Sequence, residues 1–153
     1  MDRKWFGLAA TLALGLGVGL TAYSYSYADD DLTPLGAVME KVQKQKTIIT
    51  KGTRNKTKYA ESREDVEKAA KEWVKLAKEA KPLNDAAKNA QGVDDALTQW
   101  DHLMDVWEKE AEKLVEIAGK ADSEQKAAKD QLNTINKNCT ACHQVFRIEA
   151  DDF

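Results

Sequence analysis

The sequence is short of the residues that build disulfide scaffolds, β-sheets and hydrolytic sites. Among 153 residues there are two cysteines, two histidines and two prolines. The cysteines are three positions apart, so a disulfide between them would close a very small loop and stabilise the fold little. Strand-forming segments are sparse, whereas residues that favour helices are abundant. We find no glycine-rich phosphate loop and no nucleophile–base pair, and the carboxylates are scattered among lysines, so a hydrolytic enzyme is not expected.

The first 28 residues have the pattern of a secretory signal peptide. Arg3 and Lys4 precede an apolar stretch, and the small residues Ser26 and Ala28 follow it. We expect cleavage after Ala28, which leaves residues 29–153 as one domain. The alternative is an uncleaved anchor, because an apolar run of about 18 residues is nearly long enough to span a bilayer. In both cases the folded part is exported, and a periplasmic location is expected.

The charge of the exported part limits the choice of partner. Removal of residues 1–28 would leave 21 basic and 25 acidic side chains, a net charge of −4. Such a surface does not suit nucleic acid. A redox partner protein that carries basic groups, attracted by steering rather than bound tightly, fits it better. The basic residues Arg54, Lys56 and Lys58 are predicted to form a solvated loop, with a docking patch as the alternative.

Apolar residues spaced by three, four and seven predict four helices. The first begins at the N-cap Thr33, with Pro34 as its first helical residue, and Gly52 ends it. We expect the second to begin at Ser62, the third to run from about Asp94 to Ile117, and the fourth from about Asp122 to Ile148, with residues 83–92 ambiguous. Pro82 ends the second helix. The prediction is an all-α fold, an antiparallel four-helix bundle that holds a cofactor between facing helices, with Trp73, Trp100 and Trp107 in its core.

The chemistry of the chain is concentrated in Cys139-Thr140-Ala141-Cys142-His143. The pattern Cys-x-x-Cys-His is an attachment signal for haem c, in which each thiol forms a thioether with a haem vinyl group and the histidine ligates iron. On a helix, Cys139 and His143 are one turn apart with Cys142 beside them, so all three reach one porphyrin. The motif therefore predicts one covalently attached haem c.

Three other interpretations of this motif stay open. A redox Cys-x-x-Cys usually accompanies a βαβ pattern, which this sequence lacks. A zinc site needs four ligands, and the only other histidine is His102. The third interpretation is a chance match in a helical interaction protein.

The run CTACHQVFR at the end of a four-helix sequence resembles the cytochrome c′ family, the class II c-type cytochromes. The resemblance covers most of residues 29–153 in architecture, but its specific residues are confined to the motif, Phe146-Arg147 and the first helix. It implies that the haem lies inside the bundle and that Met39 faces the iron. Family members often have an arginine where this chain has Leu35, so a contact to the haem propionates would have to come from Arg147 or Lys41. Relatives are often dimers through their first two helices, which implies a possible homodimer.

The second iron ligand has to come from upstream of the motif. Ten residues follow His143, and none is methionine. By the resemblance, Met39 is this ligand, and its thioether would favour ferrous iron and raise the potential of a six-coordinate electron carrier. If Met39 only packs in the core, the iron is five-coordinate and the protein binds NO or CO. Met104 is a rival ligand expected in the core, and His102 is expected on the surface.

Two further residues are expected near the haem. Phe146, one turn after Cys142, should pack on the porphyrin edge or in the core. Arg147, one turn after His143, either neutralises a propionate or ends the helix in solvent. The sequence as a whole predicts an exported, non-enzymatic mono-haem cytochrome that passes single electrons between redox partner proteins.

Overall fold

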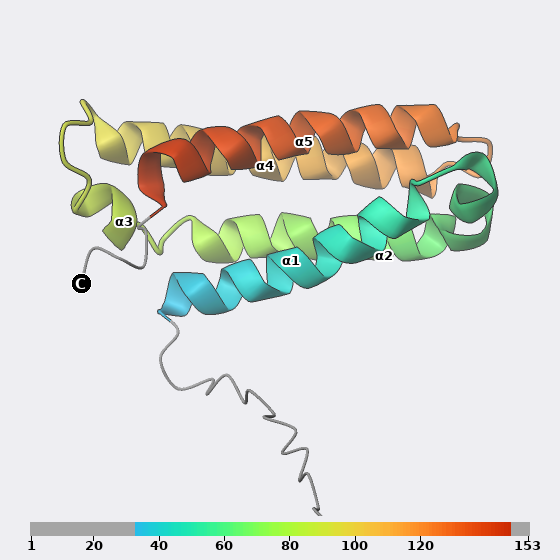
Figure 1. Ribbon diagram of the computed structural model, residues 1–153, viewed down its shortest axis with the longest axis horizontal. Helices are drawn as coiled ribbons and strands as arrows, with labels where there is room; N and C mark the ends of the chain where they lie inside the picture. The colour runs from blue at the N-terminus through green and yellow to red at the C-terminus, as the bar shows by residue number, and fades with distance from the viewer. Residues whose placement is uncertain (1–32, 148–153) are drawn as a thin grey trace, which may run out of the picture. The chain divides into compact units, whose positions relative to one another are not determined.

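The computed structural model describes residues 33–147, so the predicted signal peptide lies outside the described residues. These residues form four long helices and one short one: α1 (Pro34–Gly52), α2 (Lys56–Ala80), α3 (Asp85–Lys88), α4 (Ala96–Gly119) and α5 (Gln125–Phe146). The long helices pack antiparallel to their neighbours (Figure 1). The predicted all-α, four-helix architecture is therefore confirmed. None of the described helices combines the length and the apolar character that a bilayer crossing needs.

The first helix has the predicted ends. The Thr33 hydroxyl accepts a hydrogen bond from the backbone N–H of Gly36 at 3.1 Å, and Pro34 is the first helical residue. This satisfies one of the free N–H groups of the first turn. Gly52 is the last residue of α1, and the N–H of Thr53 closes the final turn on the carbonyl of Ile49 at 2.9 Å.

The predicted start of the second helix at Ser62 is wrong. Asn55 is the N-cap of α2, and its side-chain oxygen accepts from the N–H of Lys58 at 2.9 Å. Tyr59 explains the earlier start, because it is 3 % exposed and lies seven residues before the fully buried Val66. Burial of Tyr59 extends the apolar stripe by two turns. As a consequence, Lys56 and Lys58 belong to the first turn of α2 rather than to a loop.

The other predicted boundaries differ by a few residues. α4 begins at Ala96 because Asp95 has the left-handed φ of 50° that ends the preceding turn. α5 begins at Gln125, after Glu124, and ends at Phe146. The ambiguous residues between Pro82 and α4 contain the single turn α3, which packs on α4.

The three predicted core tryptophans are buried. The indole N–H of Trp73 donates to the carbonyl of Val42 at 3.1 Å, which ties α2 to α1. The indole N–H of Trp100 donates to the carbonyl of Lys81 at 2.9 Å, which ties α4 to the end of α2. Met104 is 3 % exposed in the same core, as expected, and His102 is exposed on the surface.

The four long helices do not pack equally tightly. α2 packs extensively on α1 and on α4, and α4 packs on α5. The remaining neighbours, α1 and α5, touch only sparsely. Figure 1 shows that α1 begins at the end of the bundle where α5 finishes. We call this lightly packed boundary the α1–α5 edge; it carries the residues that the sequence singled out.

Candidate functional site

The Cys-x-x-Cys-His motif occupies the last two turns of α5. Cys139 and Cys142 are half-buried and pack against the core from its margin. His143 is more exposed than either cysteine. The backbone N–H of Arg147 donates to the carbonyl of His143 at 3.3 Å, which ends the helix one turn after the motif. The structure thus places two thiols at the edge of the core and an imidazole beside solvent.

A stripe of half-buried apolar residues on α1 faces the same edge. Leu35, Met39 and Val42 follow one another at helical spacing and pack against the core. Lys46 continues the stripe four residues on and is close enough to Cys139 and His143 to change the pKa of both. Since residues at i and i+7 share a face of a helix, Met39 is on the side of α1 that Lys46 presents to α5. Helical spacing therefore places Met39 on the same face of α1 as Lys46.

Both cysteines are thiols at neutral pH. Burial, together with the neighbouring Cys139, raises the pKa of Cys142 to about 11. Burial also raises the pKa of Cys139, although the charge of Lys46 opposes this. Cysteines of redox Cys-x-x-Cys sites have lowered pKa values. The electrostatics thus give the dithiol–disulfide interpretation no support, and the two cysteines are not bonded to each other.

The pKa of the His143 imidazole is shifted downward, in contrast to the raised pKa values of the two cysteines. Partial burial lowers its pKa, and the positive charges of Arg147 and Lys46 lower it further. The neutral form is therefore favoured, and neutral imidazole is the form that ligates a metal. The same arrangement places Arg147 within electrostatic reach of His143, at the exposed end of α5.

The donor groups are not arranged around one point. Within residues 33–147, no group of three or more His, Cys, Asp or Glu side chains is placed to hold a metal ion. The zinc interpretation therefore finds no ligand set in this part of the chain. Two thiols and an imidazole spread over a turn and a half suit a wide planar group that each of them meets at a different atom.

Phe146 lies in the core rather than at the margin. It is 7 % exposed and meets the indole of Trp100 edge-on, with ring centroids 5.5 Å apart. Of the two expectations for Phe146, the structure shows the core placement. Leu35 is half-buried at the start of the α1 stripe, and Lys41 is exposed and paired with Glu79 on α2. Lys41 is thus engaged with α2, away from the motif.

Two buried polar atoms within the described residues have no hydrogen-bond partner. They are the indole Nε1 of Trp107 and the side-chain Oδ1 of Asn136. An unpaired buried polar group costs about 1–3 kcal/mol, so each needs a partner that a bound group or an ordered water supplies. Asn136 lies one turn before Cys139, on the helix that carries the motif. Cys139, Cys142 and His143 are the residues that would hold a haem c, and the unpaired Asn136 Oδ1 lies on the same helix.

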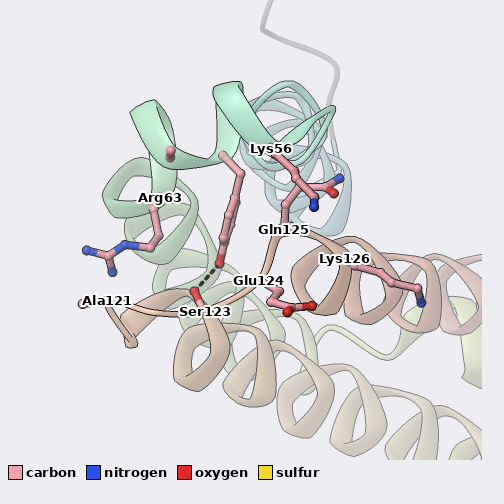
Figure 2. Close-up of a pocket in the computed structure, with 9 residues that line it drawn as sticks. Lys56, Arg63, Ala121, Ser123, Glu124, Gln125 and Lys126 are labelled. Atoms are coloured by element: carbon pink, nitrogen blue, oxygen red, sulfur yellow. Dashed lines mark hydrogen bonds between the residues drawn. The ribbon is translucent and has the colours of Figure 1, made fainter.

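A hollow of about 480 Å³ lies at the opposite end of the bundle (Figure 2). The starts of α2 and α5 and the connection between α4 and α5 surround it. A hydrogen bond of 2.8 Å between the hydroxyls of Tyr59 and Ser123 crosses it, and the Arg63 guanidinium donates to the carbonyl of Ala118 at 2.6 Å. The Tyr59 and Ser123 hydroxyls are thus engaged with each other, and no residue of the motif lines the hollow.

Sequence reasoning missed Lys46 as a neighbour of the motif. The available signal was its position seven residues after Met39, which puts the two on one helical face. No family model matches this chain, and no curated protein or solved structure is significantly similar to it.

Proposed function

We propose that this protein is a mono-haem c-type cytochrome of the cytochrome c′ type that carries single electrons. One observation supports it above all. A Cys-x-x-Cys-His motif with half-buried thiols lies near the end of α5, and α1, which touches α5 only sparsely, carries a half-buried apolar stripe that contains a methionine. The apolar side chains along this edge would be covered by a flat hydrophobic group, which supplies burial that the two helices do not give each other.

The residues of the edge have separate tasks in this proposal. Cys139 and Cys142 attach the haem through thioethers, and their protonated state protects them from oxidation before attachment. Neutral His143 ligates the iron from α5, and Met39 ligates it from α1. When bound, the haem supplies a one-electron iron couple. A thioether ligand would favour the ferrous state, so Met39 would raise the potential of the couple.

Arg147 has an electrostatic task. It lies at the exposed end of α5 and within reach of His143. A guanidinium there pairs with a haem propionate and offsets its negative charge. Leu35 stands where the resemblance would supply an arginine from α1, which leaves Arg147, one turn after His143, to make this contact.

Attachment is tested on the full chain produced in a host that matures c-type cytochromes. We expect haem staining on a denaturing gel and a mass increase equal to one haem. The Cys139→Ala/Cys142→Ala double variant should lose both signals, whereas Thr140→Ala, an exposed change between the cysteines, should keep them. Wild-type protein with neither signal contradicts the proposal.

Carbon monoxide added to the reduced protein separates the carrier from a gas-binding protein. The half-buried, only partly packed position of Met39 is the observation that keeps the second function open. If Met39 is bound to iron, carbon monoxide should react slowly or not at all. Prompt binding would assign the protein to NO or CO binding instead.

A further inference from the structure

The basic residues of this chain are segregated. Residues 41–60 contain seven Lys and Arg and no Asp or Glu, whereas the rest of the described chain, residues 33–40 and 61–147, contains 14 basic and 19 acidic residues. The segment covers most of α1, the turn after it and the first turn of α2. A protein with a negative net charge thus carries a strongly positive region along one helix.

Most of these cations lack a carboxylate of their own. Lys41 pairs with Glu79 at 3.3 Å and Lys58 with Glu61 at 2.8 Å. Within residues 33–147, no carboxylate lies within 4 Å of the other five, which are Lys44, Lys46, Lys51, Arg54 and Lys56. Within the described chain their charge is therefore unpaired, and it projects a positive potential outward.

An apolar side chain lies among these cations. Ile48 is 41 % exposed, and only one other large hydrophobic residue in the described chain, Leu97, is as exposed. Lys44, Ile48 and Lys51 follow at i, i+4 and i+7, so they share the outer face of α1. An apolar centre with a charged rim is the usual composition of a protein docking surface.

The opposite face of α1 is turned toward the proposed haem site. Lys46, two residues after Lys44 and so on the other side of the helix, is half-buried and close to both Cys139 and His143. In Figure 1, α1 lies in front of α2 and α5 in front of α4, and α1 touches α5 only sparsely. A partner seated on the outer face of α1 is therefore separated from this edge by the width of one helix, about 10 Å.

We propose that the basic surface formed by Lys44, Ile48, Lys51 and Arg54 on the outer side of α1 is the docking site for an acidic protein that exchanges electrons with the proposed haem. The identity of the partner as a redox protein rests on the proposed function. The positive surface selects a partner with clustered carboxylates, and it does so against the negative charge of the rest of the chain.

An acidic protein suits this surface better than an anionic membrane does. Helices that lie in a membrane surface present a broad apolar face to the lipid. The apolar residues of α1 are used inside the bundle, among them Val38 and Ile49, and Ile48 alone remains outside. One exposed isoleucine anchors a protein contact but gives little burial in lipid.

The first test measures the electron exchange of the haem-loaded full chain with hexacyanoferrate(III), which takes one electron from the reduced protein and becomes hexacyanoferrate(II). Since the probe is an anion, its rate should fall as ionic strength rises if it reacts at the basic surface. The Lys44→Glu/Lys51→Glu variant should react about 10-fold more slowly at low salt. The control Lys109→Glu/Lys129→Glu, which has the same net charge, should stay within about twofold.

Two outcomes of this test overturn the proposal: equal slowing of both double variants, or a wild-type rate that rises with salt. In either case the net charge of the protein, and not this surface, governs the approach of the probe. Thermal unfolding followed by circular dichroism verifies that both variants are folded.

A second test does not need the haem. Poly-L-glutamate is added to the isotope-labelled full chain, and backbone amide shifts should change at residues 44–54 and be lost in Lys44→Glu/Lys51→Glu. Unchanged amides, or shifts centred elsewhere, overturn the docking site. Binding to phosphatidylglycerol vesicles without a response to poly-L-glutamate also overturns it, in favour of a membrane surface. If the haem absorbance is absent, the proposed function fails. The second test still gives a result in that case, because it does not need the haem.

Discussion

The indole of Trp100 and the ring of Phe146 meet edge-on, with centroids 5.5 Å apart and an interplanar angle of 78°. This contact fastens the last turn of α5, directly after the motif, to the first turns of α4. Phe146→Ala should lower the free energy of unfolding by about 3–5 kcal/mol, because it removes a buried ring and leaves a cavity. Urea denaturation measures the loss. Val145→Ala, at a half-buried neighbouring position, is the control and should cost clearly less; equal losses would contradict this role of the ring.

Gly52, the last residue of α1, lies directly against α2. A Cβ at this position would come within 2.5 Å of the Val66 Cγ2 atom, and Val66 is fully buried and β-branched, so it cannot turn aside. Gly52→Ala should therefore destabilise the protein by about 1–3 kcal/mol, although alanine is the better helix former. Gly119→Ala is the control, since its Cβ would meet only the Glu67 carboxylate at 3.6 Å. Thermal unfolding should show a lower midpoint for the first variant alone.

The lowered pKa of Glu110 predicts how the free energy of unfolding depends on pH. Hydrogen bonds from Lys113 and Gln131 lower the pKa of this carboxyl below its ordinary value of 4.5. Its contribution to stability is present above that ordinary value and is lost as pH falls through the lowered pKa in the folded state. Wild-type protein should thus lose more free energy of unfolding between pH 7 and acid pH than Glu110→Gln does. Urea unfolding at a series of pH values, with the exposed Glu112→Gln as control, checks this; parallel curves for all three proteins would refute it.

Trp107 and Trp73 differ in how their indole N–H groups are satisfied. Trp73 donates to Val42, whereas the buried Nε1 of Trp107 has no partner within the described chain. In protein prepared without haem, Trp107→Phe should change the free energy of unfolding less than Trp73→Phe does. The second variant removes the hydrogen bond to the Val42 carbonyl, which adds about 0.5–1.5 kcal/mol to the loss of the larger ring. Equal costs in chemical denaturation would mean that the two indoles are equally well satisfied.

Met39 determines the coordination of the iron in the proposed cytochrome. In haem-loaded protein, Met39→Ala should convert a low-spin spectrum to a high-spin one and lower the reduction potential, because the thioether that favours ferrous iron is lost. Val42→Ala, on the same stripe of α1, should leave the spin state unchanged. Absorption spectra of both oxidation states measure the effect. A high-spin spectrum already present in the wild type, and insensitive to Met39→Ala, would assign Met39 a packing role.

The parts of the fold that local sequence determines were predictable. Thr33 and Pro34 specify the start of α1, because a hydroxyl cap and a fixed φ act within one turn. The start of α2 was not predictable, because Asn55 and Ser62 are both good N-cap residues by type. The choice between them depends on the burial of Tyr59 by other helices, which no local pattern contains.

In the candidate site, too, only the features that local sequence determines were predictable. The motif is contiguous, so its residues were evident from the sequence and their position on one helix followed. The proximity of Lys46 to Cys139 depends on which helices become neighbours, and the contact between Phe146 and Trp100 depends on the register of α4 against α5. Both relationships depend on tertiary packing between stretches of chain that are far apart in sequence.

The uneven packing of the four helices bears on how such a protein is assembled in the cell. Three boundaries of the bundle, α1 with α2, α2 with α4 and α4 with α5, provide the main interhelix packing. In the proposed cytochrome, the chain could therefore reach its topology before the haem arrives, and a maturation enzyme would meet a folded substrate with its two thiols half-buried at the margin of the core. Insertion of the haem would then part α1 and α5, which touch only sparsely, without disturbing the three main boundaries.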